Sequence, residues 1–355
     1  ATDVDEADVG DAMAEPVELR VATFNVALSD FEAVGDLAKA LEAGSDKGRK
    51  VAEIIQRVRP DVLLINEFDR DTSGEALDRW RSDYLGVGQA GQEPIAYPHT
   101  YTPDCNTGRL ADADLSGDGQ IKLPEDGYGF GNYDGQYCMV LLSRYPIESA
   151  SVRTWQNLLW RDLSGNMLPT DHYSESAQAV FRLSSKTHAD VPVVIGETVL
   201  HMLISHPTPP VFDGPEDRNG RRNFDEIRLW ADLLTPDPGE QLVDDAGNRG
   251  GLGAEALFVI AGDQNADPDK GDSVDGAIAQ LLDHPRVNAT TVPLGGNGSS
   301  ETSSFGLRVD YVLPSSNLTV KGSGVFAPAA DDPLAALATA SDHRLVWVDL
   351  VVEPH

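Results

Sequence analysis

Basic residues are scarce in this chain of 355 residues. Lysine and arginine together number 27 against 58 aspartates and glutamates, which gives a formal net charge of -31. This balance argues against a broad basic face for duplex DNA, because binding to the phosphate backbone relies on lysine and arginine. It does not exclude a nuclease, since a divalent metal can offset phosphate charge locally. The acidity also favours the binding of cations.

Cysteines and long apolar runs are scarce as well. The two cysteines, Cys105 and Cys138, lie near the ends of one long polar insertion, and both a closing disulfide and two free thiols are compatible with the sequence. No zinc-type cluster is present, and no apolar run reaches the roughly 20 residues needed to span a bilayer. Covalent catalysis is disfavoured because the sequence has no nucleophile-elbow serine and no catalytic cysteine pairing.

The chain begins at Ala1 rather than methionine, with an acidic segment. We expect residues 1–16 to form a disordered acidic tail. The missing methionine and the cysteine pair predict a secreted or extracytoplasmic protein.

Strand-like apolar runs alternate with helical patterns along the rest of the chain. This alternation predicts a two-sheet core covered by helices. The runs expected to be strands are 17–26, 61–67, 137–143, 177–183, 192–205, 256–262, 307–313 and 344–351, and the helical patterns are 47–59, 74–85, 222–234 and 275–282.

Polar side chains stand at the ends of at least five of these apolar runs. Residues i and i+2 of a strand point to the same face, so Asp263 and Asn265 can aim at one point if their strand extends that far. Strand ends gathered on one edge of a sheet are where sheet enzymes build sites. The other residues in this pattern are Asn25, Glu67, His206, Asp310, Asp342 and His343.

The order of these polar residues and their flanking segments along the chain resembles that of the endonuclease/exonuclease/phosphatase superfamily, the deoxyribonuclease I-like fold. The matching segments lie between residues 18 and 352 and include Thr23-Phe24-Asn25-Val26, Ile65-Asn66-Glu67, Leu142 to Ile147, Ser205-His206-Pro207, Gly262 to Asn265, Val309-Asp310-Tyr311 and Ser341-Asp342-His343. The resemblance implies an α+β protein with a four-layer α/β/β/α sandwich, in which helices flank two mixed, mainly antiparallel sheets. We expect a single domain over 17–355, with a long insertion at 86–136.

The resemblance also implies roles for these residues. Glu67 and Asn25 would hold the active-site ion, most simply one Mg²⁺ or Mn²⁺, and Asp342 would complete its shell. Some nucleases of the family carry an aspartate two residues after this asparagine, where this chain has Ala27. The catalytic residues would be His206, Asp263, Asn265, Asp310 and His343.

Within that catalytic set, Asp310 would orient His343 as the general base, with Asp263 as the alternative base. His206 would donate a hydrogen bond to the phosphoryl oxygen or to the leaving group. Asp263 and Asn265 would align the attacking water or hold the phosphate.

Phosphate-binding candidates come from the densest basic patch, residues 217–223. Arg221 and Arg222 open a predicted helix there, where guanidinium groups and a helix N-terminus both suit phosphate. A solvated helix start with local salt bridges is an equal alternative. Lys186 could line the same cleft.

A second metal motif lies in the insertion. Residues 114–125 follow the twelve-residue calcium-loop template, with Gly119 at the sharp turn. Lys122 and Pro124 depart from the template and predict a lone loop that orders the insertion. The expected Ca²⁺ ligands are Asp114, Ser116, Asp118, Gln120 and Glu125.

These features predict a divalent-metal-dependent phosphoric ester hydrolase, most simply a phosphodiesterase, in which metal- and histidine-activated water attacks phosphorus in line. The substrate would be a lipid headgroup, a small phosphate ester or a nucleic acid, without a stable nucleic-acid partner, and we expect a monomer. An extracellular nuclease and a non-catalytic calcium-binding module remain alternatives. The segment Leu158-Leu159-Trp160 is the one candidate for membrane docking, and a core role is as compatible.

Overall fold

The computed structural model describes residues 15–353, and their strands form two sheets. The expected acidic tail over 1–16 lies outside the described residues, apart from its last two positions. The first sheet has the order β10-β11-β1-β2-β4-β3 and the second β5-β6-β7-β8-β9. Neighbouring strands run antiparallel except in the pairs β1-β2 and β7-β8. The strands are β1 (Val17–Leu28), β2 (Val62–Phe68), β3 (His99–Tyr101), β4 (Met139–Ser143), β5 (Arg153–Thr154), β6 (His188–Ile195), β7 (Thr198–Ser205), β8 (Leu257–Asp263), β9 (Asp310–Pro314), β10 (Thr319–Val325) and β11 (Val346–Val352).

Both faces of each sheet are covered, which explains why the central strands are apolar throughout. Leu64 of the first sheet and Met202 and Val259 of the second are fully buried in one cluster between the sheets. The alternate residues of the same strands, such as Leu63 and Phe258, face outward and are also buried.

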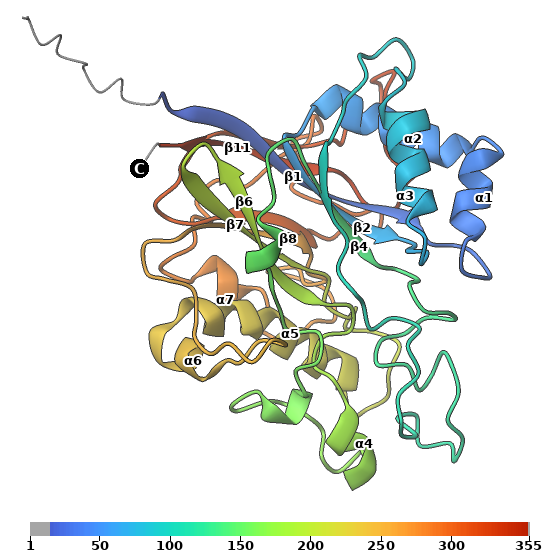
Figure 1. Ribbon diagram of the computed structural model, residues 1–355, viewed down its shortest axis with the longest axis vertical. Helices are drawn as coiled ribbons and strands as arrows, with labels where there is room; N and C mark the ends of the chain where they lie inside the picture. The colour runs from blue at the N-terminus through green and yellow to red at the C-terminus, as the bar shows by residue number, and fades with distance from the viewer. Residues whose placement is uncertain (1–14, 354–355) are drawn as a thin grey trace, which may run out of the picture.

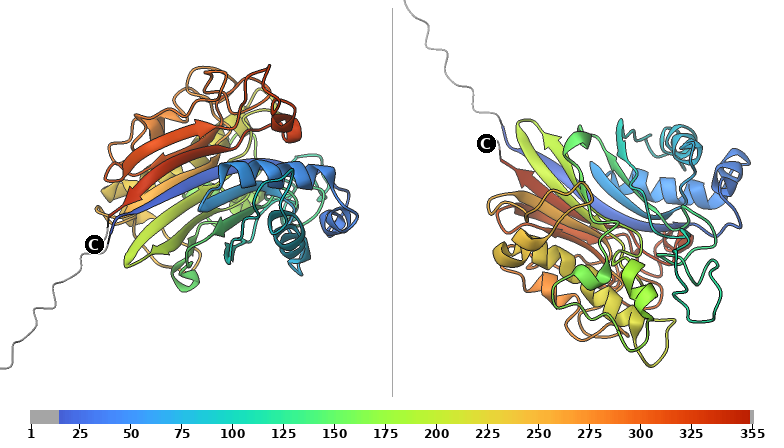
Figure 2. Two further views of the ribbon diagram at one scale, coloured as in Figure 1. Left: turned by 90° about the horizontal axis from the view of Figure 1, so that it is seen from above. Right: turned by 60° about the horizontal axis from the view of Figure 1, so that its bottom comes forward.

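Helices bury those outward faces. The first sheet packs against α1 (Asp36–Glu42), α2 (Asp46–Val58) and α3 (Glu75–Trp80). The second packs against α4 (Glu175–Val180), α5 (Arg218–Leu234) and α7 (Ala279–Leu282), and the short α6 (Pro236–Gln241) follows α5. Figures 1 and 2 show the helices outside the two sheets, with α1 to α3 on one side and α5 to α7 on the other. The predicted four-layer α/β/β/α sandwich is therefore confirmed.

The local predictions were wrong at two of the expected strands. Residues 177–183 begin inside α4, where the Ser174 side chain accepts a hydrogen bond from the backbone N–H of Ala177 and caps the helix. The run 192–205 is a hairpin of β6 and β7, because the chain reverses at Gly196, whose φ of 63° suits glycine. The short elements α1, α6, β3, β5 and β10 were not predicted.

The insertion is tied to the first sheet by a disulfide. Cys105 and Cys138 are bonded, with their Cα atoms 6.0 Å apart, and Cys138 directly precedes β4. Of the two states compatible with the sequence, the structure has the disulfide. Trp160 is fully buried in the core under α5, so the proposed docking segment has a packing role. In residues 15–353, no helix combines the length and the apolar character that crossing a membrane requires.

Candidate active site

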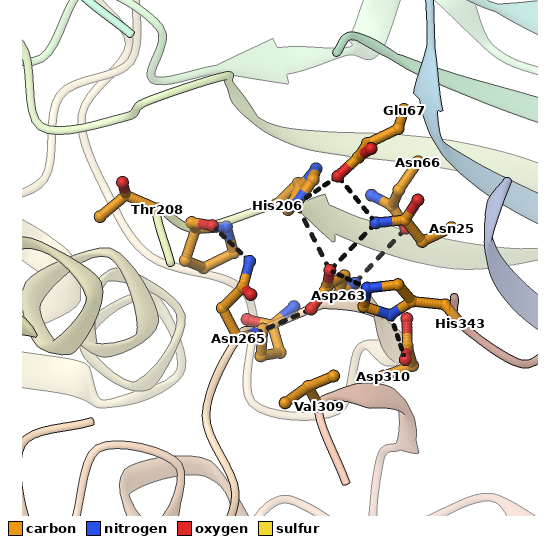
Figure 3. Close-up of polar contacts among 12 residues, drawn as sticks. Asn25, Asn66, Glu67, His206, Thr208, Asp263, Asn265, Val309, Asp310 and His343 are labelled. Carbon is orange, nitrogen blue, oxygen red and sulfur yellow. Dashed lines mark hydrogen bonds and ion pairs between the residues drawn. The ribbon is translucent and has the colours of Figure 1, made fainter. Parts of the chain in front are cut away.

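Six polar side chains converge where strands of both sheets end. Asn25 lies near the end of β1, Glu67 near the end of β2, and His206 directly after β7. Asp263 ends β8, Asp310 opens β9, and His343 precedes β11. Figure 3 shows these side chains pointing toward one another. The sequence prediction thus placed together residues that are up to 318 positions apart, from Asn25 to His343.

Asp263 is at the centre of this group and is almost completely buried. Its Oδ2 accepts a hydrogen bond from Asn25 Nδ2 at 3.1 Å and lies 3.5 Å from His206 Nε2 and 3.7 Å from His343 Nε2. Burial alone would raise the pKa of this carboxyl, but the two imidazoles outweigh it and lower the pKa well below its usual range. Asp263 is therefore an anion with one histidine on each side.

Asn265 reaches the site by a different route from the one expected. The strand ends at Asp263, and Asn265 adopts a left-handed backbone with φ 52°. Its N–H donates to Asp263 Oδ1 at 2.9 Å, and its side-chain amide donates to the carbonyl of Pro207 at 3.1 Å. Asn265 thus links the loop after β8 to the loop that carries His206.

His343 forms a buried pair with Asp310. Its Nδ1 lies 2.9 Å from Asp310 Oδ2, and the backbone N–H of Asp310 donates to Thr302 Oγ1. Burial disfavours the charged imidazole, but the carboxylates of Asp310 and Asp263 outweigh it and raise the pKa of His343 to about 10. His343 is therefore an imidazolium at neutral pH.

His206 has the opposite electrostatic character. It is 2% exposed, and its Nδ1 has no hydrogen-bond partner among residues 15–353. Burial, together with the nearby Lys186 charge, lowers its pKa. The site therefore combines a neutral imidazole on one side of Asp263 with a charged one on the other.

Glu67 and Asn25 offer hard oxygen ligands at the more open end of the site. Asn25 Nδ2 donates to Glu67 Oε1 at 3.0 Å, and the Glu67 side chain is 24% exposed. Glu67 also has φ 55°, a strained backbone conformation of the kind found at functional sites. Carboxylate and amide oxygens suit Mg²⁺. The third predicted ligand, Asp342, is exposed, and its Oδ1 accepts a hydrogen bond from the Ser341 hydroxyl at 3.3 Å.

A second set of groups could also hold an ion. Ligand atoms of Asp263, Asp310 and His343 lie within 4.8 Å of one another. The existing 2.9 Å bond between Asp310 and His343 occupies one ligand position of each residue. The Glu67 carboxylate is more exposed, and its close contacts are hydrogen bonds from the neutral Asn25 amide and Ser29 hydroxyl, with His206 at 4.0 Å, so it fits an ion better.

A buried layer behind the site comes from α5 and was not predicted. Glu226 Oε1 accepts hydrogen bonds from the backbone N–H and the hydroxyl of Ser185 at 2.6 and 2.9 Å, and its Oε2 accepts one from the N–H of Thr208 at 2.7 Å. Asn223 Nδ2 donates to the carbonyls of Thr208 and Gln264, both at 2.9 Å. These bonds hold the His206 loop and the Asp263 loop together. Polar residues on the inner side of an amphipathic helix are the sequence signal that could have indicated them.

The three phosphate-binding candidates lie in different environments. The Arg222 guanidinium is buried and donates to the carbonyls of Leu183, Tyr128 and Arg182 at 2.8, 2.6 and 2.9 Å. Those bonds give it a packing role, so the structure contradicts its prediction as a phosphate ligand. Arg221 is partly exposed at the start of α5 and makes no side-chain bond to the site. Lys186 is 7% exposed, and Glu226, Glu67 and Asp263 lie close enough to act on its charge.

The insertion loop brings three carboxylates together, with one difference from the template. Asp114 Oδ1 and Oδ2 accept hydrogen bonds from the N–H groups of Gly117 and Gly119 at 2.6 and 2.8 Å. Ligand atoms of Asp114, Asp118 and Asp126 lie within 4.8 Å of one another. Glu125, the predicted closing ligand, is exposed, and Asp126 takes its place in the cluster. Of the other two predicted ligands, Ser116 donates to Asp114 and Gln120 donates its N–H to Asp118.

Comparisons with solved structures support the fold. An endonuclease/exonuclease/phosphatase from Beutenbergia cavernae is 18% identical with a TM-score of 0.54, and the match covers 95% of this chain and 72% of that one. Sphingomyelinase C from Streptomyces griseocarneus is 16% identical with a TM-score of 0.50, covering 94% and 99%. A family protein from Leptotrichia buccalis is 13% identical with a TM-score of 0.51, covering 93% and 98%. At these identities the likeness concerns the fold alone.

Among curated proteins, no significant match is found. The profile of the Endonuclease/Exonuclease/phosphatase family, in contrast, matches residues 22–343. That range contains the complete set of converging side chains from Asn25 to His343. The chain therefore belongs to the endonuclease/exonuclease/phosphatase family.

Proposed function

We propose that this protein is a divalent-metal-dependent phosphodiesterase in which water attacks phosphorus directly. The observation that carries the proposal is the position of Asp263, whose Oδ2 lies within 3.1 to 3.7 Å of the Asn25 amide and of both imidazoles. A carboxylate between two imidazoles can accept a hydrogen bond from the attacking water and orient it toward phosphorus, while its neighbours hold the phosphoryl oxygens.

Glu67 and Asn25 would hold the ion, which we propose to be Mg²⁺. The bound ion would supply charge neutralisation at the phosphoryl oxygens. Asn25 donates to both carboxylates and accepts the N–H of Ala27 at its oxygen, so it would support the ion by fixing the Glu67 carboxylate.

The two histidines would have different roles. The raised pKa of His343 makes it a hydrogen-bond donor at neutral pH, so the anionic Asp263 is the group that would orient the attacking water. His206 presents its Nε2 to the site, 3.5 Å from Asp263 and 4.0 Å from Glu67, and an Nε2–H there can donate to the phosphate or to the departing oxygen. Burial lowers the pKa of Lys186 beside them, and an anionic phosphate bound nearby would favour the charged form of this lysine.

The substrate would be a small or lipid-borne phosphodiester. The net charge of -31 opposes binding to long nucleic acids. In the basic patch at residues 217–223, the Arg222 guanidinium binds backbone carbonyls and is not free to bind phosphate.

We further propose that the insertion binds Ca²⁺ through Asp114, Asp118 and Asp126, whose carboxylates meet within 4.8 Å. The Cys105–Cys138 disulfide supports an extracytoplasmic location, because such bonds persist in oxidising compartments.

The test compares bis-p-nitrophenyl phosphate with p-nitrophenyl phosphate as substrates of the full chain, with Mg²⁺ and with a chelator. We expect Mg²⁺-dependent release of nitrophenol from the diester. Release from the monoester alone would replace the diesterase by a phosphatase. No release from either substrate, with the protein folded, would contradict the proposed function.

A further inference from the structure

Phe305 is an exposed aromatic residue beside the site. The residue is 54% exposed, although burying a phenylalanine side chain stabilises a protein by roughly 1.5–3 kcal/mol. Its ring packs edge-on to the imidazole of His343, with the centroids 5.6 Å apart and the planes at 78°. The ring therefore covers one side of His343 and leaves about half of its own surface free.

A short turn holds Phe305 in place. The Ser303 hydroxyl donates to the carbonyl of Leu307 at 2.9 Å and accepts the Leu307 N–H at 3.0 Å, which closes the turn around the ring. Gly306 has φ 79°, a conformation that favours glycine.

The turn is also bound to the segment that carries His343. Ser304 N–H donates to the carbonyl of Asp342 at 2.6 Å, and Ser303 forms a β-bridge with His343. Phe305 and His343 are thus parts of one backbone unit, and the exposed ring keeps its position relative to the imidazole.

We propose that Phe305 is a specificity-determining residue that stacks against a planar aromatic group carried by the phosphate ester. The inference rests on the proposed function, since it takes the phosphate to lie between His206 and His343. A group attached to phosphorus on the His343 side would meet the free surface of the Phe305 ring. A fixed, flat and apolar surface favours a planar ring, because aromatic stacking adds to the gain from burial. The aromatic group would belong to an aryl ester or to the base of a nucleotide.

The experiment measures binding by calorimetry, so that it does not depend on turnover. Phenylphosphonate is compared with methylphosphonate, and thymidine 5′-phosphate with 2-deoxyribose 5-phosphate, all with Mg²⁺ present. Each pair differs by a ring, and the two pairs distinguish an aryl group from a nucleobase. The proteins are wild type, Phe305→Ala, Phe305→Leu and Phe305→Trp, with Val87→Ala as a control at a similarly exposed apolar residue (51% exposed).

We expect the wild type to bind the ring-bearing member of at least one pair roughly tenfold more tightly, as alanine scanning of base-stacking residues indicates. Phe305→Ala and Phe305→Leu should lose this preference, whereas Phe305→Trp and Val87→Ala should keep it. Equal binding of both members of each pair by the wild type would overturn the proposal, as would a full preference in Phe305→Ala or Phe305→Leu. Diester hydrolysis by the wild type, measured separately, shows whether the proposed function itself holds.

Discussion

Replacing Asp310 by asparagine should weaken the binding of the proton that His343 holds at neutral pH. The two side chains are buried, lie 2.9 Å apart and form a charge-assisted hydrogen bond. Asparagine keeps the size of the side chain and removes its charge. Asp263, 3.7 Å from the other ring nitrogen, would then be the remaining close anion. We therefore expect the pKa of His343 to fall from about 10 toward neutrality.

The size of the effect follows from that value. A pKa of about 10 against the ordinary 6.5 corresponds to roughly 5 kcal/mol of interaction energy, and Asp263 provides part of it. We expect Asp310→Asn to remove about half of this interaction energy. Because the folded-state pKa is raised, this stabilisation is fully present below pH 6.5 and is lost as the pH rises through about 10. The loss in unfolding free energy should therefore be larger at pH 7 than near pH 10.

The assay is an NMR titration of the histidine ring protons in metal-free protein, with the His343 signal assigned from a His343→Gln spectrum. In the wild type this signal should stay in its protonated position from pH 5 to about 8.5, and in Asp310→Asn it should titrate with a midpoint of about 8. A wild-type His343 that titrates near 6.5 would refute the reasoning, and so would an unchanged titration in the variant.

Two other features give predictions. Glu226→Gln replaces a carboxylate oxygen by an N–H₂ group that faces hydrogen-bond donors of Ser185 and Thr208. We therefore expect a roughly 10- to 100-fold lower kcat and a Tm several degrees lower. The control Asp232→Asn, on the same helix, should change neither kcat nor Tm by much. A Glu226→Gln enzyme with wild-type kcat would show that the contacts behind the site are dispensable. For the insertion, Ca²⁺ at about 100 times its Kd should stabilise the wild type by about 2.7 kcal/mol, and Asp126→Asn should lose most of that gain. Thermal unfolding with and without Ca²⁺ measures this stabilisation. An unchanged Tm of the wild type on addition of Ca²⁺ would contradict calcium binding by the loop.

The sequence allowed the centre of the site to be predicted because buried strands exclude charge. Glu67 and Asp263 follow apolar runs and had no structural reason to be there, and the order of such residues carried the family resemblance. The same argument explains the confirmed four-layer fold, since strands apolar on both faces require cover on both sides.

What the sequence could not supply depends on distant backbone atoms. Glu226 and Asn223 bond to loops up to 41 residues away along the chain, and no local pattern marks those partners. An arginine at a helix start fits phosphate and carbonyl oxygens equally well, so Arg222 could be assigned only from the structure. In the insertion, Glu125 and Asp126 are adjacent acids, and either could be the last carboxylate of the loop. The backbone conformation places Asp126 in the acidic cluster and leaves Glu125 exposed.

The most direct test of the central claim is the kcat/KM for bis-p-nitrophenyl phosphate with Mg²⁺, compared among wild type, Asp263→Asn and His201→Gln. His201 forms a 2.8 Å pair with Asp190 on the outer part of the second sheet, and it provides a matched control for a change to a histidine–carboxylate contact away from the site. We predict that Asp263→Asn loses activity at least about a hundredfold while staying folded, and that His201→Gln stays within about twofold of the wild type. Near-normal activity in Asp263→Asn would contradict a site centred on Asp263.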